Sequence, residues 1–163
     1  MSSADTLLQV EGLNAWYGAA HILHGVSLNV GRGEVVALMG RNGAGKSTTL
    51  KSIAGLVERR EGKVLFMGAD IRRKASHQIA RAGLGYVPED RRIFTELTVL
   101  ENLEVGRQKA RSWPGGEALP HWTPEKLFSL FPNLGEMPQR PGGQMSGGEQ
   151  QMLTVARTLM GQP

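Results

Sequence analysis

The spacing of hydrophobic and polar positions changes along the chain, and each change predicts a different element. Loosely alternating apolar and polar residues at 7–10 and 26–30 are typical of half-buried antiparallel strands. The nearly continuous apolar run at 34–39 is typical of a parallel strand covered on both faces. Residues 46–54 carry apolar side chains at helical spacing, and Gly55 supplies a stop. This part of the chain therefore predicts a strand, a glycine-rich loop and a helix in succession.

The remaining pattern predicts short elements and then a helical region. Residues 63–67 and 84–88 are expected to be strands, and 76–81 a short helix capped by Ser76. From Thr98 onward, capping residues precede apolar helical faces at 98–105 and 123–131, with loops at 112–120 and 132–144. The last helix begins at Ser146, and its expected apolar face comprises Met152, Val155, Ala156 and Leu159.

Composition narrows the class of protein. The 163 residues include 22 glycines and no cysteine, which excludes disulfide scaffolds and thiolate metal sites. No apolar run approaches the roughly 20 residues of a membrane helix, and the first residues lack the layout of a signal peptide, so we expect a cytosolic chain. The net charge of +4 comes from scattered basic pairs without interleaved aromatic residues, so no nucleic-acid partner is expected.

The segment Gly40–Thr48, GRNGAGKST, fits the phosphate-loop pattern G-x-x-x-x-G-K-[ST]. It lies between a predicted strand and a predicted helix, which is the context that the mechanism requires. Its glycines let successive backbone N–H groups turn inward toward an anion at the start of the helix. Lys46 would reach the β- and γ-phosphates, Ser47 would ligate Mg²⁺, and Thr48 is a further phosphate donor. These features predict nucleotide binding.

A second glycine-containing helix start lies about a hundred residues later, in Met145–Gln151, MSGGEQQ. Here the chain resembles the ATP-binding cassette (ABC) family, whose signature reads L-S-G-G-Q or a close variant. The runs LHGVSLNVGRGE, YVPEDRRIFTELTVLENL and MSGGEQQMLTVARTLM are similar to the ATP-binding subunits of branched-chain amino-acid importers of the LivF-like type and of their urea-importing relatives. The resemblance covers nearly the whole chain.

The resemblance implies an α/β P-loop NTPase fold: a nucleotide-binding core with an antiparallel β part at 1–97, a helical subdomain at 98–145 and the signature with its helix at 146–163. It implies ATP and Mg²⁺ as ligands, with Tyr17 stacking on adenine. Glu89 stands where the family has a glutamine that senses Mg²⁺, so Ser47 and Glu89 are the expected metal ligands. The expected nucleotide-binding residues are Tyr17, Gly40, Asn42, Gly43, Ala44, Gly45, Lys46, Ser47, Thr48, Ser146, Gly147, Gly148 and Glu149.

The family also implies partners and a location. A second cassette subunit, the same or different, would present its signature to the γ-phosphate of ATP held by this chain. Permease subunits, and through them an external binding protein, would place the chain at the cytoplasmic face of the cell membrane. The substrate expected from the resemblance is a branched-chain or related amino acid.

In the family, a strand ending in Asp-Glu and a switch histidine follow the signature, and residues 1–163 contain neither. We therefore expect the catalytic base beyond Pro163, exposed apolar edges beside the phosphate-loop strand, and ATP binding without most of the rate enhancement. Two alternatives stay open: a soluble cassette protein unrelated to transport, and a non-catalytic ATP-binding fragment.

Overall fold

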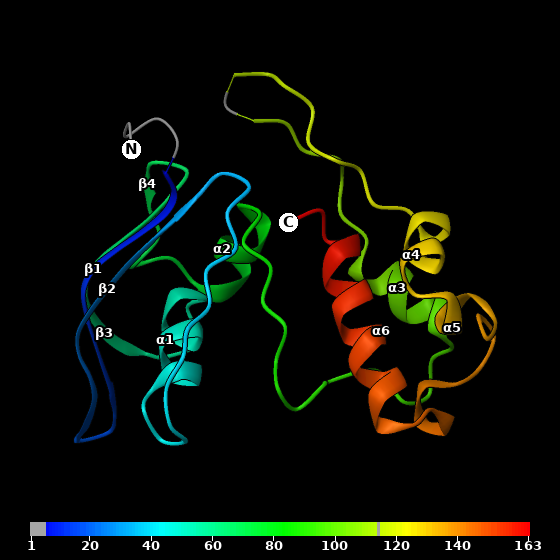
Figure 1. Cartoon of the computed structure of the whole chain (residues 1–163), viewed down its shortest axis with the longest axis horizontal. Coiled ribbons are helices and arrows are strands. Elements are labelled where there is room, and N and C mark those ends of the chain that lie inside the picture. Colours follow the sequence, from blue (N-terminus) through cyan, green and yellow to red (C-terminus); the bar gives the residue numbers. More distant parts are fainter. Residues whose placement is uncertain (1–5, 114) are drawn as a thin grey trace. The chain divides into compact units, whose positions relative to one another are not determined.

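The computed structural model describes residues 6–113 and 115–163 and contains two compact units (Figure 1). One unit extends up to Leu84, and the other runs from Gly85 to Pro163. Each is described by itself. The domain boundaries expected after residues 97 and 145 stay predictions.

A four-stranded antiparallel sheet forms one layer of the first unit. Its strands are β1 (Thr6–Tyr17), β2 (Ala20–Gly31), β3 (Arg59–Phe66) and β4 (Ala69–Asp70), in the order β2-β1-β3-β4. β1 and β2 contain the segments 7–10 and 26–30 expected from alternating polarity, and both strands are longer than expected. β3 contains most of the expected strand 63–67 but begins earlier, at Arg59, and ends at Phe66. β1 buries Val10, Leu13 and Ala15 and exposes Glu11, Gly12 and Tyr17; its alternation is interrupted by a register shift between Glu11 and Asn14.

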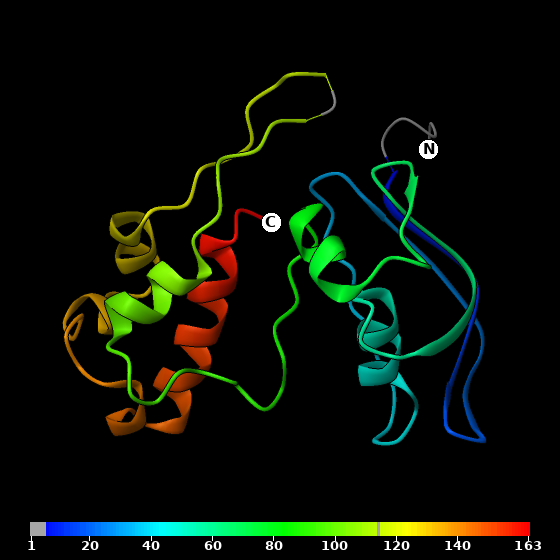
Figure 2. The same cartoon turned by 180° about the vertical axis from the view of Figure 1, so that it is seen from behind.

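Two helices, α1 (Lys46–Ile53) and α2 (Ser76–Arg81), lie on the same side of this sheet (Figures 1 and 2). They cover a continuous apolar core. Ser76 is not the cap of α2, as expected from sequence, but its first residue. The backbone N–H of Ala75, the residue at the cap, donates to the side chain of Gln78 at 3.0 Å. The buried core residues of the unit are Val10, Leu13, Ala15, Leu23, Ile53, Val57, Val64, Phe66, Ile71 and Ile79.

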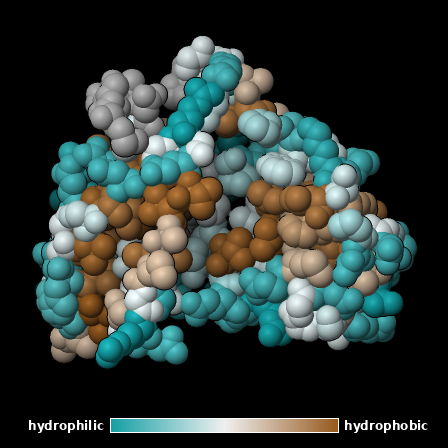
Figure 3. Space-filling model, in the orientation of Figure 1, coloured by the Kyte–Doolittle hydropathy of each residue, from teal (hydrophilic) through white to brown (hydrophobic). Residues whose placement is uncertain are grey.

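The apolar run at 34–39 does not form the buried parallel strand that its sequence predicts. It is extended backbone outside any strand, and the side chains of Val35 and Met39 are 95% and 87% exposed. Among the described residues no strand pairs with it, and without a ladder a strand has neither its hydrogen bonds nor its cover. Residues 84–88, which were also expected to form a strand, are irregular as well. Hydrophobic surface is visible on the molecule in Figure 3. The apolar side chains of the run at 34–39 are exposed, but the run lies outside any strand, so it does not form the exposed sheet edge expected beside a phosphate-loop strand.

The second unit is helical. It contains α3 (Val99–Gly106), α4 (Pro124–Leu130), α5 (Pro132–Gly135), the 3₁₀ turn η2 (Gly142–Gln144) and α6 (Gly147–Met160). Helices α3 and α5 pack against α6 (Figure 1). Both α5 and η2 lie in the segment that was expected to be a loop.

The buried face of α6 is shifted by one position from the expected one. Leu153 and Met160 are fully buried together with Ala156, whereas the expected core residues Met152, Val155 and Leu159 are only half-buried. The helical spacing is confirmed, and the side of α6 that is covered is the one that α3 and α5 contact. In α4, Leu130 is 52% exposed rather than part of the apolar face. The buried core residues of this unit are Val99, Leu103, Leu127, Leu134, Met145, Leu153, Ala156 and Met160.

Candidate functional site: a phosphate loop and a second glycine-capped helix

The glycine-rich loop ends at the first residue of α1, where backbone geometry demands glycine. Gly45 caps the helix with φ +84°, a left-handed conformation that side chains disfavour. A Cβ atom at Gly45 would also lie 2.8 Å from Cδ2 of Leu23, a buried residue of β2. The loop is therefore seated directly on the sheet. The first N–H groups of an α-helix have no acceptor within the helix, which is why helix starts bind anions.

The ammonium group of Lys46 lies over its own loop. Its Nζ donates to the backbone carbonyls of Gly40 at 2.8 Å and Arg41 at 2.9 Å. The N–H of Ala44 donates to the same Arg41 carbonyl at 3.1 Å, closing the loop into a turn. A cation at the opening of a loop whose amides begin a helix is the arrangement that binds phosphate.

The other predicted loop residues take two kinds of position. Asn42, Gly43 and Ala44 are exposed on the loop, whereas Ser47 is half-buried and Thr48 is buried at 9% exposure. Thr49, which sequence reasoning did not select, donates its hydroxyl to the carbonyl of Gly45 at 2.9 Å. That bond fixes the first turn of α1 under the loop.

Tyr17 ends β1 and is 47% exposed. The ring of its neighbour Trp16 is in contact with side chains of the two adjacent strands. The Trp16 ring stacks on His21 of β2 with ring centroids 4.3 Å apart, and the guanidinium of Arg59 from β3 lies 4.5 Å from the Trp16 ring centroid. Both residues are register partners of Trp16 across the sheet. Of the two adjacent aromatic residues, Tyr17 is thus the more available to a ligand.

His21 and His24 lie close together, with ring centroids 3.9 Å apart. His21 Nε2 is also 3.0 Å from Oδ1 of Asn14. In the described part of the chain, no group of three or more histidine, aspartate or glutamate side chains is placed to hold a metal ion.

Ser146 caps α6 through a reciprocal pair of hydrogen bonds. Its hydroxyl accepts from the backbone N–H of Glu149 at 3.4 Å, and its own N–H donates to Oε2 of Glu149 at 2.7 Å. The bond from the Ser146 backbone, followed by that from its side chain, lowers the pKa of the Glu149 carboxyl. Glu149 is therefore held as a charged partner of the cap. Gly147 and Gly148 are exposed at the helix start.

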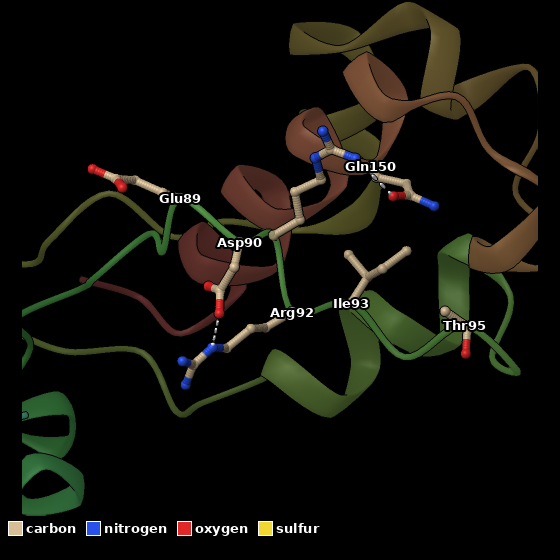
Figure 4. A pocket seen from close by; sticks show the side chains of 7 residues that line it. Glu89, Asp90, Arg92, Ile93, Thr95 and Gln150 are labelled. Atoms are coloured by element: carbon tan, nitrogen blue, oxygen red, sulfur yellow. Dashed lines mark hydrogen bonds and ion pairs between the residues drawn. The ribbon is translucent and has the colours of Figure 1, made fainter.

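Glu89 precedes a turn that lines a pocket of about 300 Å³ in the second unit. In Figure 4 the Glu89 side chain points away from the other labelled side chains. Arg92 pairs with Asp90 at 2.7 Å, and this hydrogen bond raises the pKa of Arg92. The pocket is lined by Glu89, Asp90, Arg91, Arg92, Ile93, Thr95 and Gln150.

Sequence reasoning missed Arg91, whose guanidinium lies against the start of α6. A Cβ atom at Gly147 would come 3.0 Å from its Nη1, and Nη1 is 3.4 Å from Oε1 of Gln150. Arg91 has φ +63°, a conformation that is unusual for a side-chain-bearing residue. No sequence signal indicates it, because arginine is not a residue of left-handed turns.

The structure groups the predicted site residues by unit. Tyr17 and the phosphate loop belong to the unit that ends at Leu84, whereas Glu89 and the segment 146–149 belong to the other. Within the described ranges, no helix combines the length and apolar character that crossing a bilayer requires.

With two glycine-bearing helix starts in place, comparison with known proteins identifies the family. The ABC transporter family model matches residues 23–163, and the chain belongs to this family. It is 38% identical over 157 residues to the high-affinity branched-chain amino acid transport ATP-binding protein BraG of Pseudomonas aeruginosa, covering 96% of this chain and 65% of BraG. It is 34% identical to the lipopolysaccharide export system ATP-binding protein LptB of Haemophilus influenzae, covering 97% of this chain and 64% of LptB.

Solved structures agree with this assignment. One, described as the ADP conformation of an ATP-binding cassette of an ABC transporter, is 30% identical with a TM-score of 0.71, covering 97% of this chain and 66% of that one. Another, a dimeric post-hydrolysis state of a cassette bound to ADP and phosphate, is 25% identical with a TM-score of 0.72, covering 96% and 70%. The fold is that of the ABC ATPase cassette, and the chain spans about two thirds of the length of these curated relatives.

Proposed function

We propose that this chain is the ATP-binding, energy-coupling subunit of an ABC importer for branched-chain or related amino acids. The observation that carries the proposal is the phosphate loop at the start of α1, where Gly45 is seated on Leu23 and Lys46 lies across the loop opening. The family assignment supports the nucleotide, and the similarity to BraG supports the substrate class. LptB, which is named for lipopolysaccharide export, has a similar identity, so the substrate is tested separately from ATP binding.

Each residue of the loop has a role in this proposal. The backbone N–H groups of Gly40–Lys46 surround the phosphates, with Asn42, Gly43 and Ala44 forming the exposed side of the loop. Lys46 exchanges the carbonyls of Gly40 and Arg41 for phosphate oxygens, which are stronger acceptors because they are charged. Thr48 is a further donor.

Two more residues complete the nucleotide site. Tyr17 provides an exposed aromatic face for the adenine ring. The Ser47 hydroxyl is the proposed ligand of Mg²⁺, which would neutralise charge between the β- and γ-phosphates. Glu89 is the second candidate metal ligand, proposed from its sequence position.

The second helix start would act on a partner subunit's nucleotide. Ser146, Gly147 and Gly148 present a hydroxyl and backbone amides at the positive end of α6, where a γ-phosphate is stabilised. Glu149 keeps the first turn of α6 in place through its bond with the Ser146 N–H. Two such chains, or this chain and a similar one, would enclose two ATP molecules.

Phosphate release separates a working ATPase from a binding module. Release from ATP with Mg²⁺ by the purified chain, absent in Lys46→Ala, would support turnover at this loop. ATP binding without release would favour the alternative of a non-catalytic ATP-binding fragment.

The proposed role in transport is tested by asking whether the chain binds a membrane permease. We propose that the chain sits at the cytoplasmic face of the membrane, held by permease subunits that receive substrate from an external binding protein. Co-purification of a membrane permease with the tagged chain from its native cell would support this role. Retained ATP binding with no permease recovered would favour a soluble cassette protein outside transport.

A further inference from the structure

The turn after Glu89 contains two residues in an unfavourable backbone conformation. Arg91 and Arg92 both have positive φ, +63° and +49°. The N–H of Arg92 donates to the carbonyl of Asp90 at 2.7 Å, which closes a turn of only three residues. Such left-handed positions persist in non-glycine residues only where the surroundings impose them, and they concentrate at functional sites.

Two side chains of α6 hold this turn from outside. The Thr154 hydroxyl donates to the carbonyl of Arg91 at 2.7 Å, and Nη2 of Arg157 donates to the carbonyl of Arg92 at 2.6 Å. Thr154 is fully buried, and the Arg157 guanidinium also lies over the ring of Phe94, 5.1 Å from its centroid. Both carbonyls of the strained pair are therefore bound to the same helix.

A third contact joins the turn to the start of that helix. The Arg91 guanidinium covers Gly147 so closely that a Cβ atom there would lie within 3.0 Å of Nη1. The turn is thus in contact with α6 at Gly147, Thr154 and Arg157, positions that span most of the length of this helix. Residues 146–148 are the proposed phosphate-binding segment of this helix.

We propose that Thr154 and Arg157 are positioning residues that fix the turn following Glu89 to α6, so that the turn and Ser146–Gly148 respond to a bound nucleotide as one body. The coupling rests on the proposed function, because it needs ATP at Ser146–Gly148. The attachment of the turn to α6 does not depend on the proposed function.

The chain offers a matched control for Thr154. The single hydroxyl hydrogen of Thr154 is shared between the carbonyl of Arg91, at 2.7 Å, and the carbonyl of Gln150 one turn earlier, at 2.9 Å. Thr158 makes the equivalent bond within the helix, to the carbonyl of Thr154 at 2.9 Å. A Thr→Val change at either position removes a bond within the helix, but only Thr154→Val also removes the bond to the turn. Thr154→Ser keeps the donor.

The first arm measures hydrogen exchange of the peptide 88–95 in the nucleotide-free chain. Thr154→Val should speed exchange of the Arg92 amide by roughly fivefold, the effect of one lost hydrogen bond. Arg157→Met should act in the same direction, while Thr158→Val and Thr154→Ser should leave exchange at the wild-type rate. Equal exchange in Thr154→Val and Thr158→Val would overturn the attachment.

The second arm adds ATP and Mg²⁺. The wild type should show slower exchange at 88–95 when ATP binds, and Thr154→Val should lose this response while its ATP affinity, measured by calorimetry, stays unchanged. A full response in Thr154→Val, or an ATP-bound wild type that shows no response at 88–95, would overturn the coupling. If the wild type bound no ATP, the proposed function and the coupling would both fail, and the first arm would still decide the attachment.

Discussion

The side-chain amide of Asn102 exchanges hydrogen bonds with both backbone groups of Phe94. The Phe94 N–H donates to Oδ1 at 2.9 Å, and Nδ2 donates to the Phe94 carbonyl at 3.0 Å. Nδ2 also lies 3.1 Å from the carbonyl of Leu97 and 2.9 Å from that of Thr98. Asn102 is fully buried, and its side chain is the acceptor for the Phe94 N–H. The carbonyls of Phe94 and Leu97 also accept from the backbone N–H groups of Leu97, at 3.2 Å, and Gly142, at 2.9 Å.

Replacing Asn102 by alanine should destabilise the second unit by about 2 kcal/mol, because the fully buried amide is removed and the Phe94 N–H loses its acceptor. Urea unfolding measures the change. Asn133→Ala, at an exposed asparagine of α5, is the control and should change stability by less than about 0.5 kcal/mol. Equal effects of the two substitutions would show that the Asn102 bonds do not stabilise the unit.

The stability of the fold should depend on pH through the Thr98–Glu101 cap at the start of α3. The Thr98 N–H and hydroxyl both donate to Oε2 of Glu101, at 2.8 and 2.9 Å, and these bonds lower the pKa of Glu101. Since the pKa of Glu101 is lower in the folded chain than in the unfolded one, the cap stabilises the fold at pH values above the ordinary carboxyl pKa range. That stabilisation is lost as pH falls through the folded pKa.

We therefore expect the thermal midpoint of the wild type to fall more steeply on acidification than that of Glu101→Gln. The comparison is made between pH 7 and pH 3. Parallel curves for the two proteins would contradict the assignment of the lowered pKa to this cap.

The two left-handed glycines of the phosphate loop should respond differently to alanine. Gly43 and Gly45 both have φ +84°, but a Cβ at Gly43 meets nothing within 4 Å, whereas one at Gly45 lies 2.8 Å from Leu23. Gly43→Ala should cost about 1 kcal/mol from backbone strain alone. Gly45→Ala should cost about 3 kcal/mol, because Leu23 is buried and cannot move aside.

Urea unfolding compares the two variants directly. A similar cost for both would mean that the loop is not seated on β2 as described. The pair thus separates conformational strain from packing at the same loop.

The sequence predicted the elements that local rules control. The helix starting at Lys46 is expected from the helical spacing of its apolar residues, and those starting at Val99 and Gly147 from threonine and serine at their caps; the structure confirms all three. Their capping atoms lie within a few residues of the helix start. Local spacing and capping residues were therefore enough to locate these helices.

Elements that depend on distant partners were predicted less well. The run at 34–39 has the composition of a buried strand, but a strand requires a neighbour, and the described residues provide none. The buried face of α6 was displaced by one position because helix packing, not periodicity, selects which residues are covered. The bonds of Thr154 and Arg157 to the turn at 90–92 join residues more than 60 positions apart and leave no local pattern.

The most direct test of the central claim is the affinity of the chain for ATP in the presence of Mg²⁺, measured by calorimetry for the wild type, Lys46→Ala and Lys51→Ala. Lys51 is the control, since it lies in the last turn of α1, away from the loop. We expect one ATP per chain, unchanged affinity in Lys51→Ala and about a hundredfold weaker binding in Lys46→Ala, which loses the charged donor to the phosphates. No ATP binding by the wild type, or equal affinity in Lys46→Ala, would contradict the assignment of this loop as the nucleotide site.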